Sequence, residues 1–243
     1  MDLREIRTGN AHRHPWEIAR ASAILSVIPK GQYDRIVDVG AGDLYFLERF
    51  RERYTGDVFA VDPGYMALEY GQGITLLKSL NQIPSSTMDI GFLMDVLEHE
   101  EQDGNLLWEA TQKIKPGGLM IITVPAYPSI FSPHDQFLGH IRRYNRSRLR
   151  VLTMGIDVTL HECFSFFTLP LCIRILQIAL SKVHLYRFKN EGVGSWHLSP
   201  SHWLTKLISS VLKTDFVVNR SLNRFGFPTF GLSLCMLLQK KSA

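Results

Sequence analysis

A glycine-rich turn and an acidic residue twenty positions beyond it form the first group of residues that could do chemistry. The stretch Val37-Asp-Val-Gly-Ala-Gly-Asp43 places Gly40 and Gly42 directly after an apolar run, and Asp62 ends the next apolar run. Glycine lets the backbone turn sharply and approach a ligand closely. A carboxylate at position 62 can accept hydrogen bonds from both hydroxyls of a ribose. The pattern therefore favours a nucleoside-containing ligand, although many α/β turns need glycine for structural reasons alone.

The residues that follow the second glycine indicate which nucleoside compound would bind. A dinucleotide site has a third glycine, in the pattern G-x-G-x-x-G, and a helix N-terminus that faces a pyrophosphate. Here Tyr45 stands at the third glycine position, and Asp43 would repel a pyrophosphate. An acidic loop suits a ligand with an ammonium, a sulfonium and no phosphate, which describes S-adenosylmethionine. A nicotinamide-dependent oxidoreductase is the alternative enzyme, and a non-catalytic binding subunit with the same fold is the alternative outside enzymes.

Histidines and charged side chains follow two later apolar runs, where they could hold and deprotonate a methyl acceptor. Methyl transfer needs an aligned nucleophile and, for a protonated one, a base; an unperturbed histidine titrates near ~6.5. The segment 132–144 holds two histidines, an aspartate, two arginines and a tyrosine. The predicted catalytic candidates are His99, His134, His140 and Tyr144, and the predicted acceptor-binding residues are Tyr127, Asp135, Arg142 and Arg143. The alternatives are that the segment is a structural hydrogen-bond cluster and that an arginine pairs with a protein carboxylate.

The elements that must position these residues alternate between strand and helix. Near-continuous apolar runs predict strands over 35–39, 58–61, 74–77, 88–94 and 119–124, and helical spacing predicts helices over 14–29, 44–54, 66–71 and 105–114. This alternation indicates a parallel sheet with helices on both faces, in which ligands bind at the carboxyl ends of strands. Farther along the chain, the apolar pattern predicts a helix over 148–154, a strand over 158–164, helices over 169–180 and 203–212, and a final strand over 230–238.

Five ordered motifs resemble those of class I S-adenosylmethionine-dependent methyltransferases. They are Asp38-Val-Gly-Ala-Gly42, Asp62, Asp95-Val-Leu-Glu-His99, Leu106-x-x-Glu109 and Lys115-Pro-Gly-Gly118. The resemblance implies an α/β fold with a doubly wound, mostly parallel, seven-stranded Rossmann-like sheet, whose last strand runs antiparallel between the fifth and sixth. We therefore expect a single methyltransferase domain over 1–243, with a cofactor-binding core at 14–163. A helical apolar insertion or acceptor lid at 164–228 and a last strand and tail at 229–243 would complete it.

The resemblance also implies which residues contact the methyl donor. The first turn would hold the methionine end through Asp38, Gly40, Ala41 and Gly42. The ends of the second and fourth strands would supply Asp62 for the ribose, Pro63 beside the adenine, and Met94, Asp95 and Val96 at the methionine end. Where the family often has an acid for the adenine amino group, this chain has Ser79, with Leu80 as a packing surface.

The later part of the chain bears on the acceptor. Segments 124–127 and 132–144 resemble a bacterial subgroup of these methyltransferases, whose members often lie among enzymes of glycan, lipid or secondary-metabolite assembly. This resemblance implies an acceptor pocket and not a particular acceptor. Phenylalanines at 164, 166 and 167 and the apolar residues after them could roof the site for a hydrophobic acceptor, and arginines could hold an anionic one. An ordinary helical subdomain is the alternative. Lys182, Arg187 and Lys189 could form a basic rim that rests on anionic lipid.

Composition excludes several other classes of protein. The net charge of +4 is too mild to indicate a nucleic-acid partner. The three cysteines form no CxxC pair, so no metal site and no disulfide framework is predicted. The N-terminus lacks the apolar core of a signal peptide, and the most apolar stretch, 164–180, falls short of a membrane span. We expect a cytoplasmic protein; the oligomeric state does not follow from the sequence.

Overall fold

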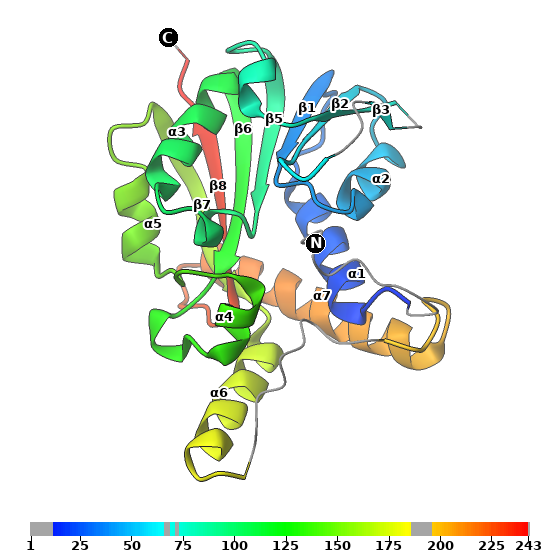
Figure 1. The fold of residues 1–243 in the computed structure, drawn as a ribbon, viewed down its shortest axis with the longest axis vertical. Helices are drawn as coiled ribbons and strands as arrows, with labels where there is room; N and C mark the ends of the chain where they lie inside the picture. The colour runs from blue at the N-terminus through cyan, green and yellow to red at the C-terminus, as the bar shows by residue number, and fades with distance from the viewer. Residues whose placement is uncertain (1–11, 66–68, 71–72, 186–195, 243) are drawn as a thin grey trace.

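A mostly parallel sheet runs through the molecule (Figure 1). The computed structural model describes residues 12–65, 69–70, 73–185 and 196–242. The strands are β1 (Arg35–Val39), β2 (Asp57–Val61), β3 (Glu69–Tyr70), β4 (Ile74–Leu77), β5 (Met88–Met94), β6 (Ile114–Pro125), β7 (Val158–Phe166) and β8 (Ser233–Lys240). Their order in the sheet is β3-β4-β2-β1-β5-β6-β8-β7. The last strand lies antiparallel between β6 and β7, so the predicted Rossmann-like arrangement of seven strands is confirmed, with β3 added at one edge.

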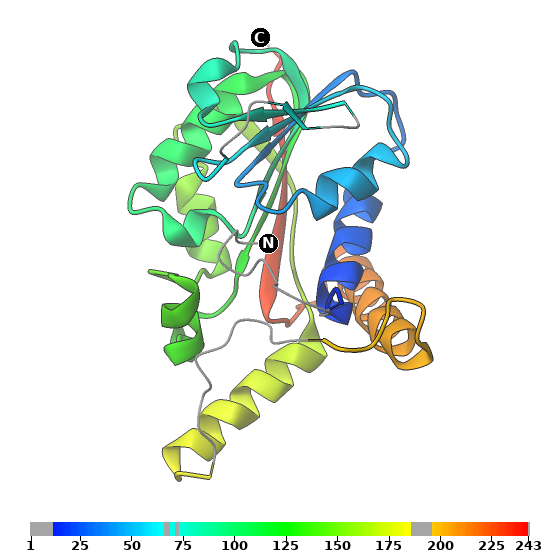
Figure 2. The same ribbon diagram turned by 45° about the vertical axis from the view of Figure 1, so that its right-hand side comes forward.

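Two layers of helices cover the sheet, as Figures 1 and 2 show. On one face lie α1 (Pro15–Val27), α2 (Tyr45–Arg51) and α7 (Trp203–Arg224), whose apolar side chains share a core with β1, β2 and β7. On the other face, α3 (Asp103–Lys113) and α5 (Arg146–Leu152) pack on a second core. The short helix α4 (Pro133–Leu138) and the 3-10 turns η2 (Leu80–Gln82), η3 (Leu97–His99) and η4 (Pro128–Ile130) connect these elements.

The carboxyl ends of the central strands meet at one edge of the sheet. In the parallel register, Val39 at the end of β1 aligns with Val61 of β2 and with Leu93 of β5. The residues that follow these strands, Gly40, Asp62 and Asp95, therefore gather there. Gly40 and Asp95 have φ angles of +72° and +56°, so the chain turns sharply at both strand ends.

Several predicted boundaries differ from the structure, and tertiary contacts explain the largest difference. Helix α7 ends at Arg224, not Leu212, because two polar residues that interrupt its apolar pattern have partners in the fold: Asp215 accepts from the backbone N–H groups of Phe167 and Thr168, and Asn219 donates to Thr168 Oγ1. Strand β6 begins at Ile114, five residues early, because Ile114 pairs with Met88 before the register shifts.

The helix predicted over 66–71 is wrong where it can be checked. Residues 69–70 form β3, which pairs antiparallel with β4, and residues 66–68 and 71 lie outside the described residues.

The aromatic residues that were predicted to roof the site belong largely to the core instead. Phe164, Phe166 and Phe167 are fully buried, and the rings of Phe164 and Phe166 pack edge-on against Phe216 of α7, with centroids 5.2 and 5.1 Å away. The prediction was wrong because their alternation with polar residues marks a strand whose inner face meets α7.

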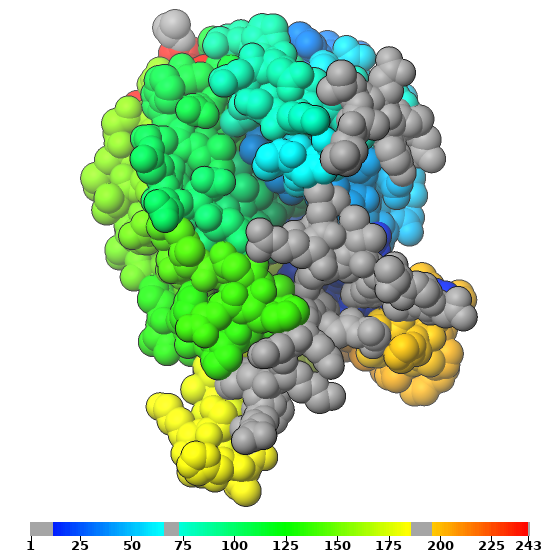
Figure 3. Space-filling view, in the orientation of Figure 1, coloured from blue at the N-terminus to red at the C-terminus, as the bar shows by residue number. Residues whose placement is uncertain are grey.

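Helix α6 (Thr168–Lys182) projects from the rounded body of the molecule (Figure 3). It exposes Leu169, Ile173 and Leu176. Among the described helices, none combines the length and apolar character that a membrane crossing requires.

Candidate functional site

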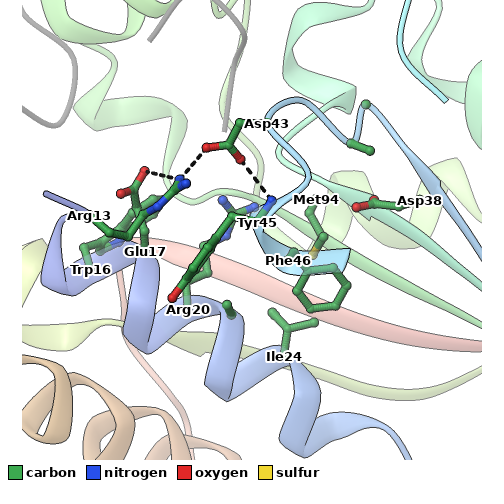
Figure 4. Close-up of a pocket in the computed structure, with 13 residues that line it drawn as sticks. Arg13, Trp16, Glu17, Arg20, Ile24, Asp38, Asp43, Tyr45, Phe46 and Met94 are labelled. Carbon is green, nitrogen blue, oxygen red and sulfur yellow. Dashed lines mark hydrogen bonds and ion pairs between the residues drawn. The ribbon is translucent and has the colours of Figure 1, made fainter. Parts of the chain in front are cut away.

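An open pocket lies where the turn after β1 and the end of β5 meet the N-terminal helix α1 (Figure 4). Its empty space, including the part open to solvent, is about 500 Å³. The lining residues are Arg13, Trp16, Glu17, Arg20, Ala21, Ile24, Asp38, Gly40, Ala41, Asp43, Tyr45, Phe46 and Met94. Four of the predicted cofactor residues, Asp38, Gly40, Ala41 and Met94, thus share one cavity.

The carboxylate of Asp38 is the most unusual group in this pocket. It is buried, and neither oxygen has a hydrogen-bond partner among the described residues. Burial raises the pKa of Asp38 to about 7, against the opposing field of Arg20. A buried unpaired carboxylate is costly. Its presence in the wall of the pocket fits a ligand that brings a cation, such as the ammonium of S-adenosylmethionine.

Asp62 holds the two neighbouring turns together. Its Oδ2 accepts from the backbone N–H of Gly42 at 3.2 Å, and its Oδ1 accepts from that of Gly64 at 2.8 Å. Tyr65 donates its hydroxyl to the carbonyl of Gly42 at 2.9 Å. Each carboxylate oxygen has a second lone pair, so Asp62 can still accept from a diol while it orients the glycine turn.

Gly40 lies against the turn after β5. A Cβ atom built on Gly40 would stand 2.5 Å from Cγ2 of Val96, closer than side chains tolerate. The structure therefore brings Val96 to the glycine turn. The close approach also gives Gly40 a steric reason to be glycine, besides its positive φ.

Helix α1 supplies one wall of the pocket, and sequence reasoning missed it. Arg13 forms an ion pair with Asp43 and stacks over Tyr45, with its guanidinium carbon 4.2 Å from the ring centroid. Arg20 forms an ion pair with Asp95 at 2.8 Å. Figure 4 shows Arg13, which lies two residues before α1, joined to Asp43 of the glycine turn, and Arg20 of α1 beside Tyr45. The signal was a polar stripe of Arg13, Glu17 and Arg20 at helical spacing beside the apolar face.

The predicted adenine contacts are spread over a more open region. Pro63 and Gly64 are exposed, which suits the flank of a ligand. Ser79 is also exposed, and its hydroxyl caps η2 by accepting from the N–H of Asn81 at 3.2 Å. Leu80 is buried in the core next to α3. The structure thus gives Ser79 and Leu80 structural roles, and their contact with adenine remains a prediction.

A buried ionic cluster anchors the segment after β6. Arg143 donates to Asp135 Oδ1 at 2.7 Å and to the carbonyl of Ala126 at 3.0 Å, while Ser132 donates to Asp135 Oδ2. Burial alone would raise the pKa of Asp135, but His140 and the Arg143 guanidinium outweigh it and hold this pKa below its ordinary value. Arg143 is therefore occupied by a protein carboxylate, as the structural alternative anticipated.

Tyr144 and Arg142 meet a second carboxylate, that of Asp103. The buried Tyr144 hydroxyl lies 2.8 Å from both Leu97 O and Asp103 Oδ2. Burial and the Asp103 contact raise the pKa of Tyr144 above its ordinary value. Arg142 and Arg148 pair with the same carboxylate at 2.8 and 2.9 Å. These contacts tie the segment to α3, so the roles predicted for Tyr144 in catalysis and Arg142 in acceptor binding gain no support from the geometry.

Of the remaining predicted residues, His99 follows β5, and Tyr127, His134 and His140 follow β6. His99 Nδ1 is 3.2 Å from the carbonyl of Gly139, and the rings of His99 and His140 have centroids 4.9 Å apart. His134, on α4, is partly buried, and this burial lowers its pKa to about 4, so it is neutral at physiological pH. Tyr127 is half-buried, with a φ of +60°. The structure thus brings His99 and His140 together beyond the end of β5.

Comparison with known proteins identifies a methyltransferase domain in the part of the chain that holds the glycine turn. Residues 37–122 match the family model of the methyltransferase domain. No curated protein matches the chain.

Solved structures share the fold at low sequence identity. A methyltransferase from Haloferax volcanii, in complex with the Trm112 methyltransferase activator, has a TM-score of 0.59 at 15% identity and aligns over 93% of this chain and 90% of its own. An S-adenosylmethionine-dependent methyltransferase from Archaeoglobus fulgidus has a TM-score of 0.53 at 18% identity, over 93% and 94%. A geranyl diphosphate methyltransferase, in complex with geranyl diphosphate and sinefungin, has a TM-score of 0.59 at 12% identity, over 92% and 77%.

The strand order and the matched domain define a class I methyltransferase. The matched segment begins at β1 and ends within β6, so it contains the glycine turn, Asp62 and the end of β5. The chain therefore contains a methyltransferase domain on a sheet with the strand order of class I S-adenosylmethionine-dependent methyltransferases. The domain match supports S-adenosylmethionine as the methyl donor and favours methyl transfer over the oxidoreductase alternative.

Proposed function

We propose that this enzyme transfers the methyl group of S-adenosylmethionine to a hydroxyl oxygen of a small or lipid-like acceptor. The observation that carries the proposal is the buried, unpaired Asp38 carboxylate in the wall of the pocket. The donor's ammonium would neutralise it, directly or through water, and Asp62 would accept from the ribose. Bound in this way, S-adenosylmethionine supplies an activated methyl group, and the protein has to align and deprotonate the acceptor.

The histidines beyond β5 support oxygen as the acceptor atom. A hydroxyl must lose its proton during the transfer, whereas an unprotonated amine can attack without a base. The rings of His99 and His140 meet edge to face just beyond β5, where they could take that proton. The test is methyl transfer from radiolabelled S-adenosylmethionine to matched panels of alcohols, phenols and amines. Label is expected in hydroxyl acceptors; label in amines alone would contradict O-methylation.

The surface around α6 supports an apolar acceptor. This helix exposes Leu169, Ile173 and Leu176. The structural neighbour crystallised with geranyl diphosphate shows that this fold can bind a prenyl chain. A peripheral membrane contact through α6 is the second interpretation; of the predicted basic rim, only Lys182 lies among the described residues.

Replacing Asp62 by alanine is expected to weaken S-adenosylmethionine binding by about 1–3 kcal/mol, because charge-assisted hydrogen bonds to the ribose are lost. Isothermal titration calorimetry measures this change. Asp57→Ala, at the exposed start of the same strand, is the matched control and should bind normally. Asp62→Asn keeps one acceptor oxygen for the turn, so its affinity for S-adenosylmethionine should lie between those of Asp62→Ala and Asp57→Ala. Unchanged affinity in Asp62→Ala would contradict the assignment.

Binding of S-adenosylmethionine is expected to strengthen as the pH rises through about 7, where Asp38 loses its proton. The ammonium requires the ionised carboxylate, so affinity should fall by up to about tenfold per pH unit below that value. Calorimetry between pH 5.5 and 7.5 measures the slope. Asp38→Asn should bind more weakly and lose the slope; a slope that persists in this variant would assign it to another group, such as Asp62.

The Asp38→Asn variant should be more stable than the wild type at high pH, although it binds the donor more weakly. Because the folded pKa of Asp38 is raised, its ionisation costs stability as the pH rises from its unfolded value of 3.8 towards 7. Asp38→Asn should therefore melt at a higher temperature than the wild type at pH 8, with little difference at pH 4. A lower Tm at pH 8 would contradict this account of the carboxylate.

A further inference from the structure

A carboxylate and two imidazoles converge just beyond the end of β5. Glu98 and His99 belong to η3, and His140 follows α4. One ligand atom from each of the three side chains lies within 4.8 Å of the others. Glu98 is fully buried and both histidines are partly buried. The cluster therefore joins two segments that are about forty residues apart in the chain.

Glu98 lacks a close cationic partner among the described residues, although the acidic residues near it have one. Its two acidic neighbours each have an arginine: Asp95 pairs with Arg20 at 2.8 Å, and Asp135 pairs with Arg143 at 2.7 Å. Neither oxygen of Glu98 has a hydrogen-bond partner in the described part of the chain, and His140 Nε2 approaches it only to 3.9 Å. An ionised carboxylate in this environment is costly unless it takes up a proton or a cation joins it.

Both histidines are oriented as metal ligands usually are. His99 Nδ1 lies 3.2 Å from the carbonyl of Gly139, and His140 Nδ1 lies 3.2 Å from the carboxylate of Asp135. A carbonyl or an ionised carboxylate can only accept, so each Nδ1 carries a proton, and in the neutral imidazole Nε2 then carries the lone pair. A histidine held by an oxygen acceptor on its second nitrogen is typical of metal sites.

We propose that Glu98, His99 and His140 bind a divalent transition-metal ion such as Zn²⁺, Mn²⁺ or Fe²⁺. Two imidazoles with one carboxylate favour such ions over Mg²⁺ or Ca²⁺, which prefer oxygen ligands. Metal–ligand distances of about 2.0–2.2 Å require the ligand atoms to stand roughly 3–3.5 Å apart. Small side-chain rotations would close the present spacing.

The proposal deepens the proposed function and rests on it for its catalytic part. Three protein ligands leave coordination positions open for a hydroxyl of the acceptor. A metal-bound hydroxyl loses its proton to water more readily, and the oxygen then attacks the methyl carbon. The carbon–sulfur bond breaks as the new carbon–oxygen bond forms, and S-adenosylhomocysteine leaves. His99 and His140 would then be ligands and not the bases that their residue type suggested.

Metal binding can be measured without any acceptor. The full-length protein is stripped with a chelator and titrated by calorimetry with Mn²⁺, Zn²⁺ and Co²⁺, and the absorption spectrum of the Co²⁺ form is recorded. We expect one ion per chain, and a Tm that rises by roughly 5–10 °C at a hundredfold excess over Kd. The wild type's failure to bind any of the three ions would overturn the proposal.

Variants locate the ion. Glu98→Gln and His140→Asn should each weaken metal binding at least tenfold, whereas Glu100→Gln, an exposed acid two residues along, should bind as the wild type does. S-adenosylhomocysteine affinity should stay unchanged in all three, which separates this proposal from the donor site. Unchanged metal affinity in both Glu98→Gln and His140→Asn would overturn the assignment, and lost S-adenosylhomocysteine binding in Glu98→Gln would show that these residues serve the donor pocket.

Discussion

Replacing Gly40 by alanine is expected to weaken S-adenosylmethionine binding more than a hundredfold. The φ of Gly40 is +72°, and its new Cβ would meet Val96 at 2.5 Å from Cγ2 and 3.2 Å from Cγ1. Because both methyl groups of Val96 are close, the turn itself must move. That turn is the one expected to pass under the donor, and its Gly42 N–H donates a hydrogen bond to the carboxylate of Asp62. Calorimetric titration with S-adenosylmethionine measures the loss.

Gly155 offers a matched control for the backbone part of this effect. Its φ is +82°, and a Cβ there would meet nothing within 4 Å. Gly155→Ala should therefore lose about 1–2 kcal/mol of stability from the left-handed backbone and keep full donor affinity. If Gly40→Ala bound the donor as well as Gly155→Ala does, the glycine turn would not lie at the donor site.

Replacing Arg143 by methionine is expected to destabilise the protein by about 3–5 kcal/mol, the usual scale for breaking a buried ion pair. Asp135 would keep its negative charge in a buried site with only neutral donors and His140 around it. Arg142→Met is the matched control, because Asp103 retains Arg148 and lies nearer the surface. It should cost about 0–1 kcal/mol. Urea denaturation followed by circular dichroism gives both values.

A second substitution tests whether the effect comes from the charge on Asp135. Asp135→Asn combined with Arg143→Met should recover part of the lost stability, since no unpaired charge then remains. If turnover in these variants falls only as far as unfolding accounts for, the segment 132–144 acts as a scaffold. If Arg143→Met stays fully stable but loses turnover, Arg143 contacts the acceptor after all.

The sequence by itself determined the sheet and the place of the donor site. Continuous apolar runs such as 36–39 and 88–94 can satisfy their backbone only as buried strands, and right-handed crossovers then align their carboxyl ends. The glycines of the first turn are local requirements of the backbone, so they are visible without the fold. Asp62 was predictable for the same reason, because its position follows directly from the end of a strand.

Only the tertiary structure decided which charged side chains neutralise one another and which are left without a partner. Arg143 looked as suitable for an acceptor as for Asp135, because a guanidinium binds either carboxylate equally well. The pairing of Arg20 with Asp95 joins α1 to the end of β5 across 75 positions of chain. The approach of His140 to Glu98 likewise depends on how α4 packs. Such contacts depend on distances in the folded protein, and residue type alone does not encode them.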